Sequence, residues 1–402
     1  MTNAPPRPAK LPTVRLHPNR QKRLLSGHPW VYSNEVQMDT PAKALPSGAV
    51  ARLVDAGGAA LGVIAFNPHT LIAGRLLSRD ADVTVDRDFF IERIGRAVRL
   101  RDRLFPHPFY RAVHAEADGL PGLIVDRYGD VATVQSNAAF IESRMDDVMA
   151  ALDAAFAPKA VMLRNDSTQR ALEGMAAETH VLRGAFDGPV ELLENGVRYL
   201  ADLAGGQKTG WFYDQRDNRA YAARFAAGAR VLDVFSYTGS FALACATAGA
   251  REVVAIDRSQ PALDLAAKAA ELNGVADKCR FVRADAFNEM EKMVEAGEKF
   301  DLVIVDPPAF VKAKKDLAVG CRAYRRLARL GAKLTAPGGI LVAASCSHNV
   351  DPPTFAEQVA RGLNDAGRTG RILRSSGAGA DHPVHPHLPE SAYLKAVTLV
   401  VD

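Results

Sequence analysis

The second half of this chain alternates apolar segments with stretches of helical length, and this alternation limits the folds that it can adopt. The apolar segments are almost continuous, which is typical of strands in a parallel sheet that helices cover on both faces. Helix-like stretches of about 10 to 15 residues separate most of them. We predict an α/β domain whose strands lie at 230–235, 252–257, 280–283, 300–305 and 339–344.

Two smaller regions precede this domain. Between about residues 12 and 80 short strands are broken by Gly and Pro, and a hairpin is predicted around Ala56-Gly57-Gly58. The next region mixes both kinds of element: helices at 88–104 and near 141–156, a hairpin of 122–128 with 131–135, and a strand at 160–164. We therefore expect three domains, a β-rich one at 1–80, a small α+β one at 81–192 and the α/β one at 193–402.

The charge of the chain is concentrated at its start. The formal net charge of +4 is mild and does not by itself indicate a nucleic-acid partner. The first 34 residues, however, contain no acid and six basic residues: Arg7, Lys10, Arg15, Arg20, Lys22 and Arg23. With Trp30 and Tyr32 nearby, this pattern indicates a basic face for RNA, although a solvated basic tail explains the charges equally well.

Several classes of protein are disfavoured by what the sequence lacks. No signal-peptide core and no run of about 18 apolar residues occurs, so we expect a cytoplasmic protein without a membrane partner. Its four cysteines form no CxxC pair and no cluster with metal-ligand spacing. We therefore expect reduced thiols, no disulfide and no metal site.

Acidic residues follow the first three predicted strands of the α/β domain. Asp233 begins a turn that contains Ser236 and Gly239, Asp257 ends the second strand, and Asp285 with Phe287 follows the third. In an open parallel sheet, ligands bind at the carboxyl ends of the strands. Each acid alone could be a helix N-cap, but together they describe a nucleoside pocket. The turn lacks GxGxxG, which disfavours a dinucleotide and favours S-adenosylmethionine (SAM).

The last two predicted strands end in more unusual segments. Asp306-Pro307-Pro308-Ala309-Phe310 follows the fourth strand, and its two prolines rule out a continued helix or ladder. It forms a rigid rim that can aim Asp306 and Phe310 at a planar substrate. Cys346 follows the fifth strand between two serines, where it is either a small core residue or a nucleophile.

These motifs resemble those of a known family. VLDVFSYTGSF, VVAIDRS, RADAF, DPPAF and AASCS look like the ordered motifs of class I SAM-dependent methyltransferases, and KTGWFYDQR, EADGLPGL and PESAYLK narrow the resemblance. The chain resembles the RlmI-type 23S ribosomal RNA cytosine-C5 methyltransferases over nearly its whole length. This resemblance implies an N-terminal PUA domain, a central strand-strand-helix-strand-strand domain and a C-terminal Rossmann-like domain.

The resemblance also implies roles for individual residues. Asp257 would bind the ribose hydroxyls, Asp285 and Phe287 would hold the adenine, and the turn of Asp233, Ser236 and Gly239 would contact the methionine part. The segment before the first strand would close over the cofactor. The residues implied to bind SAM are Phe212, Asp214, Arg216, Asp233, Ser236, Gly239, Asp257, Asp285, Phe287 and Asp306. Ser240 departs from the pattern, because many relatives carry a second glycine there.

The chemistry of cytosine C5 explains why such a site needs Cys346 and Asp306. C5 is a poor nucleophile until a thiolate adds to C6, and a neighbouring group must hydrogen-bond or protonate N3. Cys346 and Asp306 end strands that we expect to be neighbours, so both are predicted catalytic residues. The other thiols fit this role less well, since Cys245 lies in an apolar helix, Cys279 precedes a strand and Cys321 lies in a basic helix. His348 could tune the thiol or simply be exposed.

The substrate would be a splayed RNA base held by stacking and phosphate contacts. We expect Pro307 and Phe310 to contact the base, with Trp211 and Tyr213 as further candidate stacking groups. Arg20, Lys22 and Arg23 would contact phosphates. The predicted partner is 23S ribosomal RNA. The sequence does not establish the oligomeric state, and a homodimer is one arrangement that it allows.

Two alternatives to a cytosine-C5 methyltransferase remain at this stage. In the first, DPPAF activates a base nitrogen and Cys346 is structural. In the second, the chain is an RNA-binding ribosome-assembly factor whose methyltransferase domain is inactive, which the complete set of cofactor acids disfavours. A dehydrogenase is disfavoured by the missing glycine-rich turn.

Overall fold

The computed structural model describes residues 11–402, so Arg7 and Lys10 of the basic N-terminal segment lie outside the described residues. The chain forms two compact units. The first contains the chain up to Asp187 together with Leu203–Thr209 and Pro383–Ser391. The second contains Gly188–Asp202, Gly210–His382 and Ala392–Asp402.

The N-terminal part of the first unit is a five-stranded sheet with its own apolar core. The strand order is β1-β3-β4-β5-β2, and the hairpin predicted around Gly57 is the antiparallel pair β3–β4. Val14, Leu53 and Phe66 are among the buried residues between the sheet and its short helices. The elements are β1 (Thr13–Arg15), α1 (Lys22–Leu25), β2 (Trp30–Val31), α2 (Thr40–Lys43), β3 (Ala49–Val54), β4 (Ala60–Phe66) and β5 (Gly74–Ser78).

A second five-stranded sheet, in the order β10-β9-β8-β7-β6, completes the first unit. The predicted hairpin is β7–β8, whereas the helix predicted near 141–156 is divided into α4 and α5 because Arg144 leaves the helical conformation. The elements are α3 (Arg87–Leu104), β6 (Phe109–His114), β7 (Leu123–Tyr128), β8 (Val131–Ser136), α4 (Ala139–Glu142), α5 (Met145–Phe156), β9 (Ala160–Asn165), α6 (Gln169–Leu172) and β10 (Glu178–Arg183). The order β7-β8-α4-α5-β9-α6-β10 resembles a strand-strand-helix-strand-strand series, with the short helix α6 inserted between its last two strands and α3 and β6 before it.

The second unit contains a seven-stranded sheet in the order β15-β14-β13-β16-β17-β19-β18. All five predicted strands are present and pair in parallel. Two further strands, β18 and β19, were not predicted, and β19 pairs antiparallel with both β17 and β18. The strands are β13 (Arg230–Val234), β14 (Glu252–Asp257), β15 (Cys279–Arg283), β16 (Phe300–Val305), β17 (Thr335–Ser345), β18 (Gly370–Ser376) and β19 (Lys395–Val401), and a separate hairpin joins β11 (Val190–Glu194) to β12 (Val197–Ala201).

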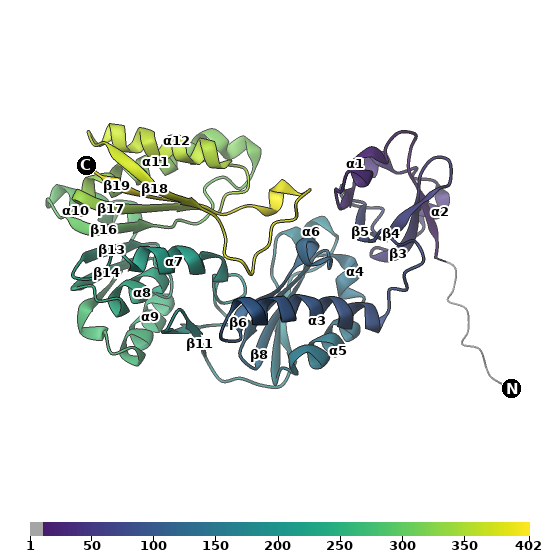
Figure 1. Cartoon of the computed structure of the whole chain (residues 1–402), viewed down its shortest axis with the longest axis horizontal. Coiled ribbons are helices and arrows are strands. Elements are labelled where there is room, and N and C mark those ends of the chain that lie inside the picture. Colours follow the sequence, from purple (N-terminus) through teal and green to yellow (C-terminus); the bar gives the residue numbers. More distant parts are fainter. Residues whose placement is uncertain (1–10) are drawn as a thin grey trace. The chain divides into compact units, whose positions relative to one another are not determined.

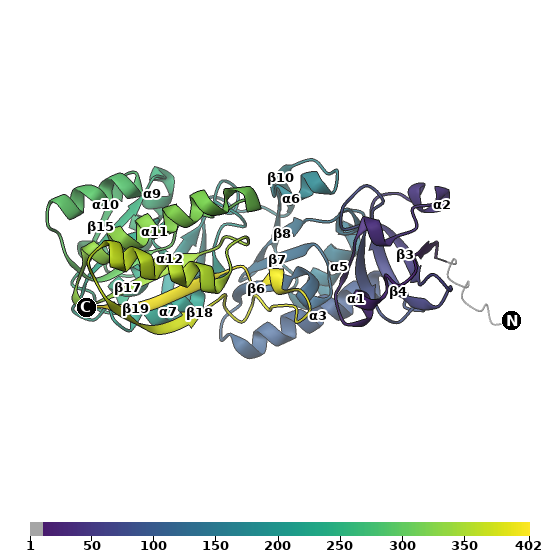
Figure 2. The ribbon, with the colours of Figure 1, turned by 90° about the horizontal axis from the view of Figure 1, so that it is seen from above.

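Helices cover both faces of the seven-stranded sheet, as the near-continuous apolar strands predict (Figures 1 and 2). One layer contains α7, α8 and α9, and the other contains α10, α11 and α12. The helices are α7 (Arg216–Ala223), α8 (Ser240–Thr247), α9 (Gln260–Leu272), α10 (Ala286–Glu295), α11 (Leu317–Leu334) and α12 (Pro352–Asp365). Within residues 11–402, no helix is long and apolar enough to cross a membrane.

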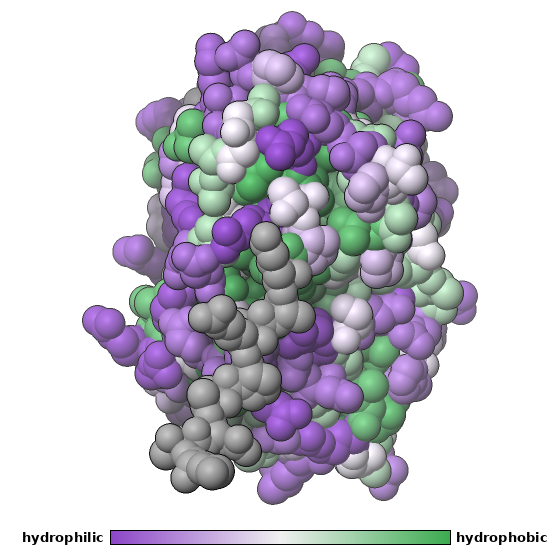
Figure 3. Space-filling model, turned by 90° about the vertical axis from the view of Figure 1, so that its right-hand side faces the viewer, coloured by the Kyte–Doolittle hydropathy of each residue, from purple (hydrophilic) through white to green (hydrophobic). Residues whose placement is uncertain are grey.

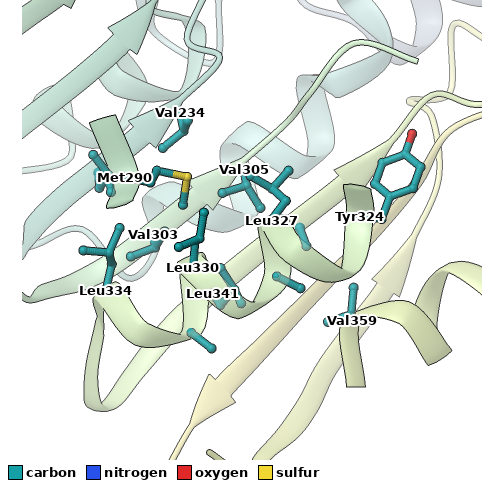
Figure 4. Packing of buried hydrophobic residues seen from close by; sticks show 14 of the residues in the cluster. Val234, Met290, Val303, Val305, Tyr324, Leu327, Leu330, Leu334, Leu341 and Val359 are labelled. Carbon is teal, nitrogen blue, oxygen red and sulfur yellow. The ribbon is translucent and has the colours of Figure 1, made fainter. Parts of the chain in front are cut away.

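The α11 helix is the centre of the core on its face of the sheet. Leu327, Leu330 and Leu334 of this helix meet Val303 and Leu341 from the strands (Figure 4). Tyr324 lies at one end of the cluster, and its hydroxyl points away from the apolar residues labelled there (Figure 4). The same helix therefore anchors the core and carries a polar group to the end of the sheet.

We predict that Leu330→Ala lowers the free energy of unfolding of the second unit by about 2–5 kcal/mol, because it leaves a cavity against the sheet. The chain has two tryptophans, so a Trp30→Phe background leaves Trp211 of the second unit as the sole fluorescent reporter in urea titrations. Leu317→Ala on the same helix is the control, because Leu317 is 39% exposed. Equal losses for the two variants would contradict the assignment of Leu330 to the core.

Candidate active site

The parallel register brings the predicted site segments of the second unit to one edge of the sheet. Val234 of β13 is in register with Ile256 of β14 and with Val305 of β16. Val305 is in turn in register with Ala343 of β17. The strands that end before Asp306 and Cys346 are therefore neighbours, as predicted, and these two residues follow at the same edge.

The turn after β13 has an unusual backbone. Phe235, Tyr237 and Gly239 all have positive φ, at 66°, 50° and 76°. Such values are uncommon outside glycine and are found at functional sites, where the surrounding structure maintains the strain. Ser236 and Thr238 are buried within this turn, and their hydroxyl oxygens hydrogen-bond to none of the described residues. Buried polar atoms of this kind fit a turn that contacts a polar ligand.

Asp233 is also buried, and only one of its two carboxylate oxygens accepts a hydrogen bond from the described residues. Its Oδ2 accepts a hydrogen bond from the backbone N–H of Ala242, near the start of α8, at 2.9 Å. Its Oδ1 has no partner among the described residues. The pKa of Asp233 is raised to about 7, mainly by burial and also by the neighbouring charges of Asp306 and Asp257, while the hydrogen bond from Ala242 opposes this rise. A cationic ligand group beside Oδ1 would favour the ionised form.

The acids at the ends of β14 and β15 differ in their surroundings. Asp257 accepts hydrogen bonds from the backbone N–H groups of Tyr237 and Ser259, both at 2.9 Å, so its carboxylate is held rigidly beside the strained turn. Asp285 caps α10 through the N–H of Asn288 and forms an ion pair with Arg258 at 2.9 Å. For Asp285 the N-cap interpretation is thus confirmed, and an additional role in adenine binding stays a prediction.

Aromatic rings form a group beside these acids. Phe287 lies 6.4 Å from Phe235 and 6.1 Å from Phe310, measured between ring centroids. Phe310 also packs on Tyr324 at 4.9 Å. The proline-rich rim therefore directs Phe310 toward the ring predicted to hold the adenine, while Pro307 is buried and Asp306 is half-buried.

Gly239 has a structural explanation in addition to its predicted role. Its φ of 76° favours glycine, and a Cβ there would lie 2.9 Å from the Cβ of Ala266 on α9. A side chain at this position would therefore collide with α9, which explains why a glycine is needed here. The predicted contact of this turn with the methionine part of SAM stays a prediction.

Helix α7 and the segment before it are held by one buried carboxylate that the sequence analysis missed. Glu194 accepts two hydrogen bonds from Arg219, at 2.7 and 2.9 Å, and one from Trp211 Nε1 at 3.3 Å. Arg216 lies 3.5 Å from the same carboxylate. The role of Glu194 could not be recognised from the sequence, because a charged residue next to a predicted turn is normally assigned to the surface.

The candidate cofactor residues of this segment are placed differently from one another. Asp214 is buried and accepts a hydrogen bond from Tyr393 at 2.5 Å, and Phe212 contacts the ring of Tyr237 in the strained turn. The proposal that Trp211 and Tyr213 stack on a base was wrong, because both side chains are only 1% exposed. Trp211 packs on Tyr199 within the core.

A hydrogen-bond network fixes the turn that carries Cys346. The Tyr324 hydroxyl lies 2.8 Å from the hydroxyls of both Ser345 and Ser347, the two neighbours of the cysteine. The Ser347 hydroxyl also accepts a hydrogen bond from the N–H of Val311, the residue after Phe310. The two serines therefore join the cysteine turn to α11 and to the rim that follows Asp306.

The other three cysteines are poorly suited to act as nucleophiles. Cys245 is fully buried, and burial raises the pKa of its thiol strongly. Burial also raises the pKa of Cys279, to about 11, and that of Cys321. The predicted core position of Cys245 is confirmed. Cys346 is half-buried and alone follows a strand at the edge that holds Asp306.

The predicted phosphate contacts lie in the first unit. Arg20 and Lys22 are exposed, whereas Arg23 forms an ion pair with Glu35 at 2.9 Å and lies 4.1 Å from the centre of the Tyr32 ring. Glu35 is the first acid of the chain, so the basic segment is partly neutralised just where it ends. In Figure 3, hydrophilic residues cover most of the visible face and hydrophobic residues form small separate groups.

Comparison with known proteins identifies the class of this site. Residues 152–396 match the S-adenosylmethionine-dependent methyltransferase family, and residues 14–79 match a PUA-like domain. The fold and the site are thus those of a SAM-dependent methyltransferase with an N-terminal PUA-like domain, which confirms the predicted fold class and cofactor.

More specific relatives are similar over almost the whole chain. The ribosomal RNA large subunit methyltransferase I of Aeromonas hydrophila is 38% identical over 395 residues, or 96% of this chain and 98% of that protein. That of Erwinia tasmaniensis is 38% identical over 392 residues, with 95% and 98% covered. The chain belongs to the ribosomal RNA large subunit methyltransferase I family.

Solved structures agree on the fold. A methyltransferase from Streptococcus mutans has a TM-score of 0.81 at 23% identity, with 97% of this chain and 100% of that chain covered. A methyltransferase solved in complex with S-adenosylhomocysteine has a TM-score of 0.83 at the same identity and coverage.

The residues present fit SAM. The unpartnered oxygens of Asp233, Ser236 and Thr238 lie at the end of β13, and the fixed carboxylate of Asp257 lies beside them. Phe287 and Phe235 offer aromatic surface next to Asp285. Among residues 11–402, no group of three or more His, Cys, Asp or Glu side chains could hold a metal ion.

We predict that the affinity for SAM rises with pH up to about 7 and is constant above it. A cation bound beside Asp233 lowers the pKa of this carboxyl from its raised value, so binding near pH 6 releases a proton. Calorimetric titrations in two buffers of different ionisation enthalpy measure this release. Asp233→Asn is expected to bind more weakly and without proton release, and release that persists in this variant would contradict the prediction.

We predict that Tyr324→Phe lowers the free energy of unfolding of the second unit by about 1–3 kcal/mol, because the buried serine hydroxyls lose a partner. The ring contacts with Phe310 and Phe355 remain. Tyr221→Phe is the control, since the structure records no hydrogen bond for that hydroxyl among the described residues. Urea titrations of both variants, again followed by Trp211, test this difference.

Proposed function

We propose that this protein is a SAM-dependent methyltransferase that modifies C5 of a cytosine in large-subunit ribosomal RNA. The ribosomal RNA substrate is suggested by the names of relatives that match over 94–97% of the chain. The observation that carries the choice of C5 is Cys346, a half-buried thiol that follows the strand beside the one ended by Asp306. Methyl transfer to a base nitrogen requires no such thiol.

The proposed reaction uses Cys346 and Asp306 in fixed roles. The Cys346 thiolate adds to C6, so an S–C6 bond forms, and the electron pair of the C5=C6 bond is delocalised toward N3. Asp306 hydrogen-bonds or protonates N3, which makes C5 nucleophilic. SAM supplies the methyl group from its sulfonium, and its sulfur keeps the electron pair of the broken bond. A base then removes the C5 proton, the electron pair of the C5–H bond re-forms C5=C6, the thiolate leaves, and a proton given to N3 returns to Asp306.

The proposed positions of SAM follow the strand ends. Asp257 would bind the ribose, Phe287 and Asp285 the adenine, and Asp233 with Ser236 the methionine part, with Gly239 shaping the turn. Phe212, Asp214 and Arg216 would form the segment next to the cofactor, and their attachment to Glu194 and Tyr393 would keep it in place. Asp306 would lie between cofactor and base.

The proposed RNA contacts are divided between the two units. Phe310 and Pro307 would bind the base in the second unit. Arg20 and Lys22 would contact phosphates from the first unit, with a smaller contribution from Arg23 because Glu35 pairs with it. We propose the domain limits 1–80, 81–192 and 193–402 for the RNA-binding, central and methyltransferase parts.

We predict that Cys346→Ala reduces methyl transfer at least about 10³-fold, because the covalent route is lost. The assay measures transfer of labelled methyl groups to ribosomal RNA fragments, followed by mass analysis of the nucleosides. Cys321→Ala is the matched control and should keep its activity, since Cys321 lies on α11.

RNA that contains 5-fluorocytosine should form a stable adduct with the unmodified enzyme, since fluorine at C5 cannot leave as a proton does. Near-normal methylation by Cys346→Ala would exclude the covalent mechanism and favour a base nitrogen as acceptor. Methylated nucleosides other than 5-methylcytidine would exclude C5 directly. Absence of SAM binding in calorimetry would favour an inactive assembly factor.

A further inference from the structure

Lys395 is a buried lysine without a carboxylate partner. It begins β19, is 4% exposed, and forms no ion pair with an acid among residues 11–402. Its Nζ donates hydrogen bonds to the backbone oxygens of Ser347 and Tyr393, at 2.5 and 2.8 Å. Lysine is almost never buried without a counter-charge, so the two neutral acceptors leave this ammonium group unexplained.

The position of Lys395 relates it directly to Cys346. In the antiparallel pair β17–β19, Lys395 lies opposite Ser345, the residue before the cysteine. Its Nζ binds the oxygen of Ser347, the residue after the cysteine. The ammonium therefore lies against the turn of Ser345, Cys346 and Ser347 and is close enough that a charged Cys346 raises the pKa of Lys395.

We infer that Lys395 is the counter-ion of the Cys346 thiolate and acts as a positioning residue for the nucleophile. This inference deepens the proposed function, on which it rests. A thiolate is the reactive form of cysteine, and an adjacent cation increases its population at neutral pH. The hydrogen bonds to the two backbone carbonyl oxygens hold the ammonium group in place without neutralising its charge.

Lys395 carries its charge under ordinary conditions. Burial lowers the pKa of Lys395 to about 8, a net value in which the charges of Cys346 and Asp351 already offset part of the effect of burial. The group is thus protonated at neutral pH, and its desolvation strengthens any interaction with a nearby anion.

Other titratable groups around the turn do not supply this charge. Asp351, the N-cap of α12, and Asp306 at the end of β16 are acids, which would disfavour a thiolate. The Tyr324 hydroxyl contacts the two serines, and burial raises its pKa. His348 is exposed and lies against the Tyr393 ring at 5.2 Å. Among these groups, Lys395 is accordingly the buried cation beside the cysteine turn.

The test measures the pKa of the Cys346 thiol by alkylation. The rate of iodoacetamide labelling of the Cys346 peptide, followed by mass spectrometry from pH 5 to 10, gives the midpoint separately from the other cysteines. We expect a midpoint below about 8.5 in the unmodified protein and a rise of about one unit or more in Lys395→Met and Lys395→Gln. Lys395→Arg should restore a low midpoint, and Lys268→Met on the exposed face of α9 is the control.

The glutamine variant separates charge from structure, because its amide can still donate hydrogen bonds to the Ser347 and Tyr393 oxygens. SAM binding and circular dichroism check that each variant is folded. An unchanged midpoint in folded Lys395→Met or Lys395→Gln would overturn the inference. If neither variant folds, the unmodified protein decides, since a midpoint at or above about 8.5 excludes a counter-ion role.

The result of the alkylation experiment does not depend on whether the proposed function is correct. Alkylation reports the ionisation of Cys346 whether or not the thiol attacks a base. Methylation that survives in Cys346→Ala would refute the covalent mechanism and leave a measured shift in the thiol pKa intact. If Cys346→Ala loses methylation as predicted but Lys395→Gln leaves the midpoint of the Cys346 thiol unchanged, only the counter-ion role of Lys395 is refuted.

Discussion

The parallel pairing of β13 with β14 and β16, and of β16 with β17, is the constraint on which the site depends. It brings the residues that follow four strands to one edge of a sheet, although the first and the last of them lie more than a hundred positions apart in the chain. The apolar packing of α11 against Val303 and Leu341 holds β16 and β17 in this register. From the same helix, the Tyr324 hydroxyl binds both serines beside Cys346. The α11 helix therefore supports both the apolar core and the geometry of the cysteine turn. A substitution that disturbs the packing of this helix is expected to disturb the turn as well.

The site combines rigid polar support with polar atoms left without protein partners. Asp257, Ser345 and Ser347 are held by hydrogen bonds from neighbouring segments. Asp233 Oδ1 and the hydroxyls of Ser236 and Thr238 lack such partners among the described residues. If these atoms only bound water they would lie at the protein surface, because a buried polar group without a hydrogen-bond partner costs stability. Their unmet hydrogen bonds are best explained by a ligand, and the positive φ values of the turn are consistent with a strained, functional loop.

The sequence was sufficient for the parts of the fold that follow from local pattern. Continuous apolar runs identified β13 to β17, and the acids after them identified the cofactor edge. Pairing partners and burial were harder to predict. The apolar run at Lys395–Val401 was overlooked as a strand, and its insertion between β17 and β18 is a non-local arrangement. Trp211 looked like an exposed stacking group because its burial depends on Glu194 and Tyr199, which lie in the β11–β12 hairpin. The role of Lys395 depends on cross-strand pairing in the same way.

The position of β19 has a consequence for the order in which the sheet assembles. β18 precedes β19 in the chain, yet its partner in the sheet is β19, which also pairs with β17. β18 therefore has no strand to join until β19 has been synthesised. Lys395 arrives with β19, so the Cys346 turn obtains its buried cation only in this last step. If Lys395 has the role proposed above, completion of the sheet and completion of the candidate nucleophile would thus be one event.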